Sequence, residues 1–239
     1  MTSKITLFQH GTGAMIVPGL FDGTIDIQEL LTHGDTGIGS GDGLDGESII
    51  NNGTPLLIRG DGSVTIADDH FTVPFVNAHF AAYSTINNIQ INDFQSLGNY
   101  IFKHHQYQNI LFSVKLHGQF EWVKTRSVFK QSKPYPSLVA TAKSEKRFES
   151  QHLSGTVIAY YYPDAFSKFA VGGFHAHFIS DDQSIGGHLM NFSGFNGDLG
   201  IQKFKKLDLE LPIDNADYLN HDFKNDDIEA AINQAERES

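Results

Sequence analysis

The sequence contains no cysteine among its 239 residues. This absence excludes disulfides, thiolate metal ligands, iron–sulfur clusters and a cysteine nucleophile. Any metal would therefore be held by nitrogen and oxygen ligands. The chain also lacks an apolar run long enough for a membrane span, and its first residues show no apolar segment of signal-peptide length. These absences favour a soluble protein, which we expect in the cytoplasm, with no membrane partner.

Positive charge is scarce as well. The 17 Lys and Arg residues are outnumbered by 28 Asp and Glu, which gives a formal net charge of −11 with histidines neutral. Nucleic-acid binding depends on clustered Lys and Arg, and the basic residues here are scattered. We therefore expect no nucleic-acid partner. The 40% of residues that are hydrophobic suffice for one full core or for two small lobes that share an interface.

Aromatic residues and glycine are plentiful, with 19 Phe, 8 Tyr and 23 Gly. Together with short alternating runs, they predict a strand-rich protein with a few helices. The predicted strands are 5–9, 48–51, 73–80, 110–116, 120–128, 156–162, 173–180, 188–192 and 203–209, together with a hairpin whose arms are 56–58 and 64–66. The predicted helices are 27–31, 93–105, 136–148 and 227–237. A division near residues 106–110 would separate two sheet-bearing lobes, residues 1–108 and 109–239.

The most distinctive segment is GGFHAHFISDDQSIGGH at 172–188. His175 and His177 alternate along a predicted strand and so project from the same face. The polar stretch 180–187 ends in two glycines and suits a hairpin loop, which would bring His188 back across that face. Three neutral imidazoles with an open fourth position form the ligand set of a catalytic zinc. Because the chain has twelve histidines, a chance cluster of surface or core histidines is the alternative.

A glycine-rich segment at 33–47 contains Gly41-x-Gly43-x-x-Gly46, which formally matches a dinucleotide-binding fingerprint. That motif requires a strand before it and a helix after it, and neither is predicted here. The spacing of its acidic residues also fails the calcium-loop pattern. We interpret the segment as a glycine-rich connection in a sheet. Glu47, which enters the next strand, is its candidate functional residue.

Arg126 lies in the strand predicted at 120–128, which also contains the only tryptophan, Trp122. One interpretation is an exposed arginine stacked on that ring. The other is a planar guanidinium that binds a substrate carboxylate through two hydrogen bonds. The residues of the strand leave both interpretations open.

Taken together, these segments resemble the α-acetolactate decarboxylase family. The motifs that carry the resemblance are, in chain order, QHGT at 9–12, GLFDG at 19–23, LTHGDTGIG at 31–39, LDGE at 44–47, TRSV at 125–128, PYP at 134–136, GFHAHFISDD at 173–182 and GGH at 186–188. They span nearly the whole chain. The His-x-His block with its Ser-Asp-Asp and Gly-Gly-His return is specific to the family.

The resemblance implies a carboxy-lyase of the α/β class, of the α+β type, with a mixed sheet in an N-terminal lobe and a mainly antiparallel sheet in a C-terminal lobe. It also implies a homodimer that uses Zn²⁺ to convert 2-acetolactate into acetoin and CO₂. The site residues that it implies are the zinc ligands His175, His177 and His188 and the active-site residues Arg126, Glu47 and Glu236. Glu229 is the alternative to Glu236, because short C-terminal alignments slip.

The chemistry of this substrate suits such a site. Loss of CO₂ from a 3-keto acid pushes two electrons onto the ketone oxygen and gives an enediolate, for which zinc would be the Lewis-acid electron sink. A stereospecific proton transfer then gives acetoin. The donor could be Glu47 or Glu236 with a raised pKa; if both carboxylates ligate zinc, it is Arg126 or a bound water.

Other functions remain compatible with the residues alone. A cupin-like metal enzyme can also use His-x-His on a strand, and a zinc hydrolase can use the same three histidines. A non-enzymatic β-rich binding module would need no metal.

Overall fold

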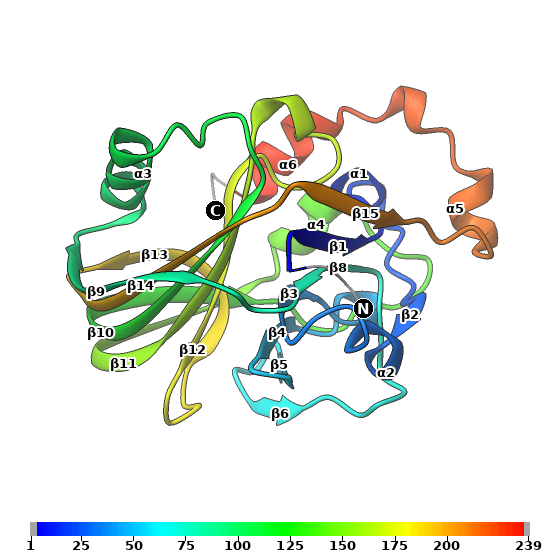
Figure 1. Ribbon diagram of the computed structural model, residues 1–239. Coiled ribbons are helices and arrows are strands. Elements are labelled where there is room, and N and C mark those ends of the chain that lie inside the picture. The colour runs from blue at the N-terminus through cyan, green and yellow to red at the C-terminus, as the bar shows by residue number, and fades with distance from the viewer. Residues whose placement is uncertain (1–3, 237–239) are drawn as a thin grey trace.

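The computed structural model describes residues 4–236, apart from the side chains of Asn233 and Glu236. Two β-sheets make up most of this chain, and short helices lie at their margins and over their junction (Figure 1). The mixed α+β class that the resemblance implied is therefore confirmed. Within residues 4–236, no helix is long and apolar enough to cross a membrane.

The first sheet has seven strands in the order β15-β1-β8-β3-β4-β5-β6. They are β1 (Thr6–His10), β3 (Thr36–Ser40), β4 (Glu47–Asn51), β5 (Thr54–Ile58), β6 (Val64–Ile66), β8 (Phe75–His79) and β15 (Lys206–Glu210). β1 and β15 run parallel, whereas the other neighbours are antiparallel, so the sheet is mixed. A separate ribbon pairs β2 (Ile25–Asp26) with β7 (Thr72–Val73).

The second sheet has six antiparallel strands in the order β11-β12-β13-β10-β14-β9. They are β9 (Ser84–Ile91), β10 (Phe112–Ser127), β11 (Lys146–Tyr162), β12 (Gly173–Ser180), β13 (Gly186–Ser193) and β14 (Phe195–Lys203). Along one edge, β10 pairs first with β14 and then with β13, and along its other edge it pairs with β11. Strands β10, β11, β12 and β13 therefore close on themselves.

The helices are short. They are α1 (Gly13–Ile16), α2 (Ile27–Leu30), α3 (Phe94–His104), α4 (Leu138–Ala142), α5 (Ala216–Asn220) and α6 (Ile228–Glu236). The helix α3 begins after Asp93, whose side chain accepts a hydrogen bond from the backbone N–H of Ser96, and it packs on the second sheet. In Figure 1, α1, α4 and α6 gather above the junction of the two sheets.

Most predicted strands are present, and the hairpin predicted at 56–66 is confirmed as β5 and β6. The sequence pattern does not reveal β3, β9 and β14. The glycine-rich residues of β3 suggested only a connection. In the structure Gly39 lies so close to the backbone of Phe75 and Val76 in β8 that a Cβ atom would collide with it. Here glycine permits close strand pairing.

Predictions of element length were wrong in two regions of the chain, 110–128 and 136–162. The strands predicted at 110–116 and 120–128 form the single strand β10. The helix predicted at 136–148 ends at Ala142, and β11 begins at Lys146. Pairing of β11 with the whole of β10 outweighs the local helical pattern, because it satisfies the backbone and adds Phe148 to the second core.

The division into lobes of residues 1–108 and 109–239 stays a prediction, and both sheets draw strands from both sides of it. The second sheet includes β9, which precedes the division. The first sheet includes β15, which follows it and pairs with β1. This exchange covers the edge of β1, where unpaired N–H and C=O groups would otherwise be exposed.

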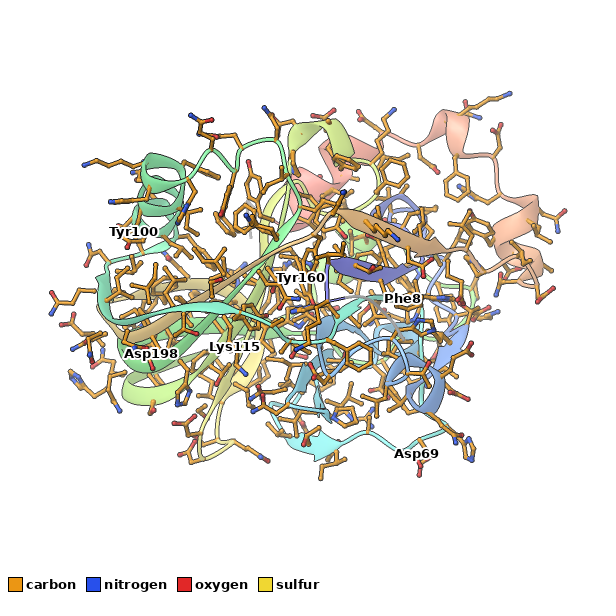
Figure 2. The ribbon with its side chains drawn as sticks, viewed as in Figure 1. Phe8, Asp69, Tyr100, Lys115, Tyr160 and Asp198 are labelled. Carbon is orange, nitrogen blue, oxygen red and sulfur yellow. The ribbon has the colours of Figure 1, made fainter. Side chains whose placement is uncertain are left out.

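Between the sheets lies a buried core. Figure 2 shows Tyr160 near the centre of the molecule, whereas Asp69, Tyr100 and Asp198 lie at its periphery. Tyr160 and Tyr162 both belong to β11, are fully buried, and pack with strands of the first sheet. The side chains of β11, a strand of the second sheet, therefore connect that sheet to the first one through this core.

A polar network is embedded in this core. The Tyr162 hydroxyl donates to Gln9 Oε1 at 2.6 Å and accepts from Asn77 Nδ2 at 2.8 Å, and all three side chains are buried. Gln9 belongs to β1, Asn77 to β8 and Tyr162 to β11, so the network connects the two sheets. Burial raises the pKa of Tyr162, so its hydroxyl stays protonated and able to donate.

Tyr162→Phe is expected to lower the free energy of unfolding by about 1–3 kcal/mol, because Gln9 and Asn77 would each lose a buried hydrogen-bond partner. Tyr161→Phe is the matched control. The hydroxyl of Tyr161 bonds the Gln108 carbonyl at 3.5 Å near the surface, so its loss should change stability by less than about 0.5 kcal/mol. Urea unfolding measures both variants, and equal losses would contradict the role of the network.

Candidate active site

The three histidines singled out by the motif come together on neighbouring strands. His175 and His177 lie on one face of β12, and His188 of β13 is the direct cross-strand partner of His177. One potential ligand atom from each ring lies within 4.8 Å of the others, and all three side chains are buried. The structure thus assembles the cluster that the spacing predicted.

Arg126 joins the cluster from β10, where it is the cross-strand partner of His188. A Cβ atom on Gly187, whose φ is +121°, would collide with the Arg126 carbonyl oxygen, so glycine allows β13 to approach β10 just before His188. Arg126 is 6% exposed. The interpretation of an exposed arginine stacked on Trp122 is therefore wrong, because this end of β10 is covered by neighbouring elements.

Glu47 reaches the cluster from the first sheet. It begins β4, directly after the glycine-rich segment, and its Oε2 lies 3.4 Å from His177 Nε2. The next residue contributes through its backbone, because the Ser48 carbonyl oxygen accepts a hydrogen bond from His177 Nδ1 at 2.8 Å. The site therefore lies where the two sheets meet.

The contact with Ser48 determines the protonation of His177. A carbonyl oxygen can only accept, so the proton lies on Nδ1. Burial, and next the neighbouring His175, hold the pKa of His177 well below its usual value, so the ring is neutral and Nε2 carries a lone pair. Burial, and next Arg126, likewise lower the pKa of His188.

A divalent metal ion fits this set of donors. His177 Nε2 is buried, has no hydrogen-bond partner among the residues that the structure describes, and faces the Glu47 carboxylate. The lone pair of His177 Nε2 and the negative charge of the Glu47 carboxylate both favour a cation between them. Neutral imidazoles are good ligands for zinc and other transition metals, and an Nδ1–H bond to a carbonyl is typical of metal-bound histidine. The buried group His175, His177 and His188 could therefore bind a metal.

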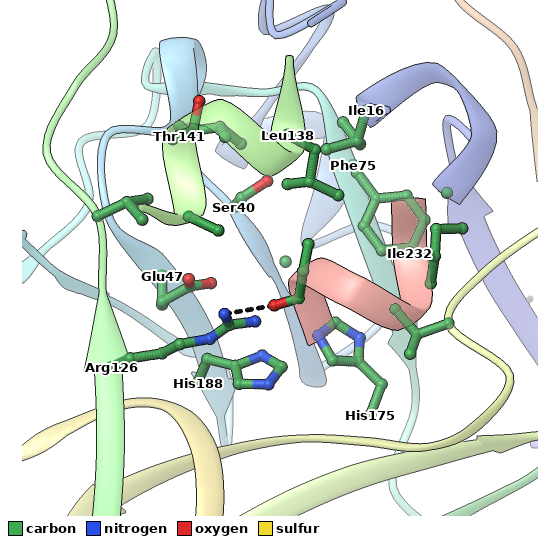
Figure 3. Close-up of a pocket in the computed structure, with 17 residues that line it drawn as sticks. Ile16, Ser40, Glu47, Phe75, Arg126, Leu138, Thr141, His175, His188 and Ile232 are labelled. Carbon is green, nitrogen blue, oxygen red and sulfur yellow. Dashed lines mark hydrogen bonds between the residues drawn. The ribbon is translucent and has the colours of Figure 1, made fainter. Parts of the chain in front are cut away.

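A pocket opens beside the histidines. In Figure 3, Glu47, Arg126, His175 and His188 gather on one side of it. Apolar side chains form the other walls, namely Ile16, Leu44, Phe75, Val128, Leu138, Val171 and Ile232. This combination suits a small ligand with one polar end.

The C-terminal helix α6 covers part of this pocket. Ile232 and Ala235 are buried and line it, and Arg126 Nη1 donates to the Ala235 carbonyl oxygen at 2.6 Å, the dashed line in Figure 3. The helix predicted at 227–237 is thus present as α6 (Ile228–Glu236) and docked, and residue 237 lies outside the described residues. Glu236 is its last residue, and the side chain of Glu236 lies outside the described part of the structure. Glu229, the alternative, is exposed.

Sequence reasoning missed Glu145, which the structure brings to Arg126. Its side chain is 4% exposed, and its Oε2 accepts a hydrogen bond from Arg126 Nη1 at 2.7 Å. The segment around it has mixed charges and a helical pattern, which suggest a solvated helix face. Only the register of β10 with β11 could have revealed the pairing, and that register is set by tertiary contacts.

A family model described as alpha-acetolactate decarboxylase matches residues 7–225. The chain is 34% identical over 211 residues to alpha-acetolactate decarboxylase of Brevibacillus brevis, a match that covers 87% of this chain and 74% of that protein. It is 31% identical over 241 residues to the Streptococcus thermophilus alpha-acetolactate decarboxylase, covering 99% of this chain and all of that protein.

Solved structures show the same fold. The crystal structure of alpha-acetolactate decarboxylase from Bacillus subtilis strain 168 matches with a TM-score of 0.90 and 27% identity, covering 97% of this chain and 99% of that one. A Staphylococcus aureus protein described as similar to alpha-acetolactate decarboxylase matches with a TM-score of 0.91 and 28% identity, covering 97% of this chain and all of that one.

The buried histidines predict that the fold is sensitive to acid. Burial lowers the pKa of His79 to about 3, and the pKa values of His177 and His188 are also lowered. Below the ordinary value of about 6.5, the unfolded chain binds protons that the folded chain excludes. The free energy of unfolding should therefore fall as the pH drops below about 6.5, by up to about 1.4 kcal/mol per pH unit for each such group.

Urea unfolding of the metal-free protein between about pH 7.5 and pH 5 measures this dependence. His79→Gln, which removes one of the three groups, should make the dependence less steep. An unfolding midpoint that stays constant over this range would contradict the prediction.

Proposed function

Because the chain belongs to the alpha-acetolactate decarboxylase family, whose members are carboxy-lyases, we propose that it decarboxylates 2-acetolactate to acetoin and CO₂ with the help of Zn²⁺. The observation that carries the proposal is the buried cluster of His175, His177 and His188, of which His175 and His188 line the pocket. Three imidazoles with room for a substrate form the donor set of a catalytic zinc.

We propose that these histidines hold the ion as neutral ligands. When bound, Zn²⁺ supplies Lewis-acid stabilisation of the charge that develops on the ketone oxygen as CO₂ leaves. The Ser48 carbonyl keeps the His177 proton on Nδ1 and so presents Nε2. Burial disfavours protonation of His177 and His188, so their lone pairs stay available at neutral pH.

We assign Arg126 to the negative charge of the substrate. Its guanidinium is buried beside His188 and lines the pocket, where the low exposure strengthens its attraction for an anion. The planar fork can bind the substrate carboxylate or stabilise the enediolate that remains after CO₂ departs. It would thereby orient the bond that breaks.

We assign the final proton transfer to a carboxyl group, with Glu47 and Glu236 as the candidates. Glu47 lines the pocket next to His177, where it can ligate the ion or move a proton. Glu236 directly follows Ala235, which also lines the pocket, and this supports Glu236 over the exposed Glu229. One of the two would protonate the enediolate carbon on a single face.

The family resemblance supports two further proposals, a homodimeric assembly and a cytoplasmic location. Sedimentation equilibrium of the purified protein would decide the first, and fractionation of the cells that produce it would decide the second.

The ligand assignment predicts that His175→Ala, His177→Ala and His188→Ala each lose most of the bound zinc. Each should lower CO₂ release from racemic acetolactate more than about a hundredfold. The fold should survive, because catalytic zinc sites usually lie on a scaffold that folds without the ion. Metal analysis, a CO₂ and acetoin assay and circular dichroism measure the three effects.

The control for these variants is His104→Ala, which changes an exposed histidine at the end of α3 and should alter neither zinc nor activity. A variant of the cluster that retains full zinc and normal turnover shows that its histidine is not a ligand. A zinc-loaded wild-type protein that releases no CO₂ but hydrolyses esters would favour the hydrolase alternative.

The assignment of Glu236 predicts a difference between two variants of α6. Glu236→Gln keeps the size of the side chain and removes its ionisation, so kcat should fall at least about tenfold. Glu229→Gln, on the exposed part of the same helix, should leave kcat within about twofold of the wild type. Steady-state kinetics with matched thermal unfolding measures both, and the reverse order of effects would move the assignment to Glu229.

A further inference from the structure

We propose that Glu145 is a positioning residue that holds Arg126 in the pocket and, through Arg126, holds α6 over it. Glu145 is not among the residues that line the pocket, and its contact with the site is its hydrogen bond with Arg126. The effect on turnover rests on the proposed function. The effect on α6 depends only on the contacts described below.

Glu145 lies between α4 and β11 and bridges two arginines. Its Oε2 accepts from Arg126 Nη1 at 2.7 Å, and its Oε1 accepts from Arg147 Nε at 2.7 Å. Both bonds join a carboxylate to a guanidinium, so they are charge-assisted and strong. The Glu145 side chain is 4% exposed, so it is buried between these two arginines.

The two arginines occupy directly opposite positions of β10 and β11. Like charges in this position destabilise a sheet, and the carboxylate between them offsets the repulsion. The partners differ in burial, since the Arg147 side chain is 45% exposed and the Arg126 side chain 7%. Arg147 can be solvated by water, whereas a buried guanidinium depends on protein anions and acceptors. Glu145 therefore matters chiefly to Arg126.

The same nitrogen of Arg126 extends the contact to α6. Nη1 donates both to Glu145 and to the Ala235 carbonyl oxygen at 2.6 Å. The last carbonyls of a helix lack partners within the helix and carry its negative dipole end, so a guanidinium stabilises that terminus. Among the residues that the structure describes, α6 is also anchored by apolar contacts, with Ile232 packed against Val17 and Val171. Arg126 adds a polar and directional anchor to them.

Removal of the Glu145 carboxylate should therefore have two coupled effects. Arg126 would lose one of the acceptors that orient its guanidinium, and a misdirected guanidinium would lower kcat/KM. The last turn of α6 would lose a fixed donor and open more often. A structural role limited to global stability would not affect α6 more than the rest of the fold.

The experiment compares Glu145→Ala and Glu145→Gln with the control Glu149→Ala in the zinc-loaded full chain. Glu149 forms the corresponding ion pair with Lys124 at 3.0 Å on the same two strands, but it is 51% exposed and is paired with Lys124 instead of Arg126. Backbone amide hydrogen exchange reports the opening of α6. Steady-state kinetics gives kcat and KM, and metal analysis reports the zinc content.

We expect Glu145→Ala to accelerate exchange in α6 and to lower kcat/KM, each by at least about tenfold, with zinc content unchanged. Glu145→Gln retains an acceptor oxygen for Arg126 but removes the charge, so its effect on both quantities should lie between those of the wild type and of Glu145→Ala. Glu149→Ala should change neither. If Glu145→Ala does not fold, Glu145→Asp replaces it, because its shorter side chain withdraws the carboxylate from Arg126 while keeping the charge.

Unchanged exchange in α6 in the folded Glu145→Ala or Glu145→Asp variant would overturn the proposal, and so would a loss of activity without faster exchange. A wild-type protein that releases no CO₂ from acetolactate would instead refute the proposed function. The exchange measurement would still decide the role of Glu145.

Discussion

The hydrogen-bond register of three antiparallel strands places the candidate active site. Arg126 pairs with His188, and His188 pairs with His177, so one row across β10, β13 and β12 carries a guanidinium and two imidazoles. A slip of one residue in either pairing would turn these side chains to the opposite face of the sheet. β10 is paired on both edges within the closed set of strands, which resists such a slip.

The first sheet completes the site by packing against this row. The Ser48 carbonyl selects the tautomer of His177, and Glu47 faces the nitrogen that the tautomer leaves available. Both contacts depend on the distance between the sheets, which the buried network around Tyr162 helps to maintain. Burial has two consequences here. It keeps the imidazoles of His177 and His188 neutral, as a metal ligand must be, and it makes the folded state sensitive to acid.

Arg126 connects the centre of the site to its cover. Its backbone belongs to the row of paired strands, while its guanidinium contacts Glu145 and the carbonyl end of α6. A buried cation needs such partners, because water cannot solvate it. The second sheet therefore fixes the backbone of Arg126, and Glu145 and α6 fix its guanidinium in the pocket.

Residue spacing was enough to identify the histidine cluster, because alternation along a strand puts His175 and His177 on one face and a glycine-containing turn returns His188 to them. The family motifs favoured an active-site role for Arg126 over the interpretation as an exposed, stacked arginine. Sequence patterns did not predict the burial of Arg126, its pairing with Glu145, or the strand that begins where a helix was expected. Spacing and propensity describe residues that are close in sequence. Burial, ion pairing and strand register depend on segments far apart in the chain, and here their contacts outweighed the local preferences.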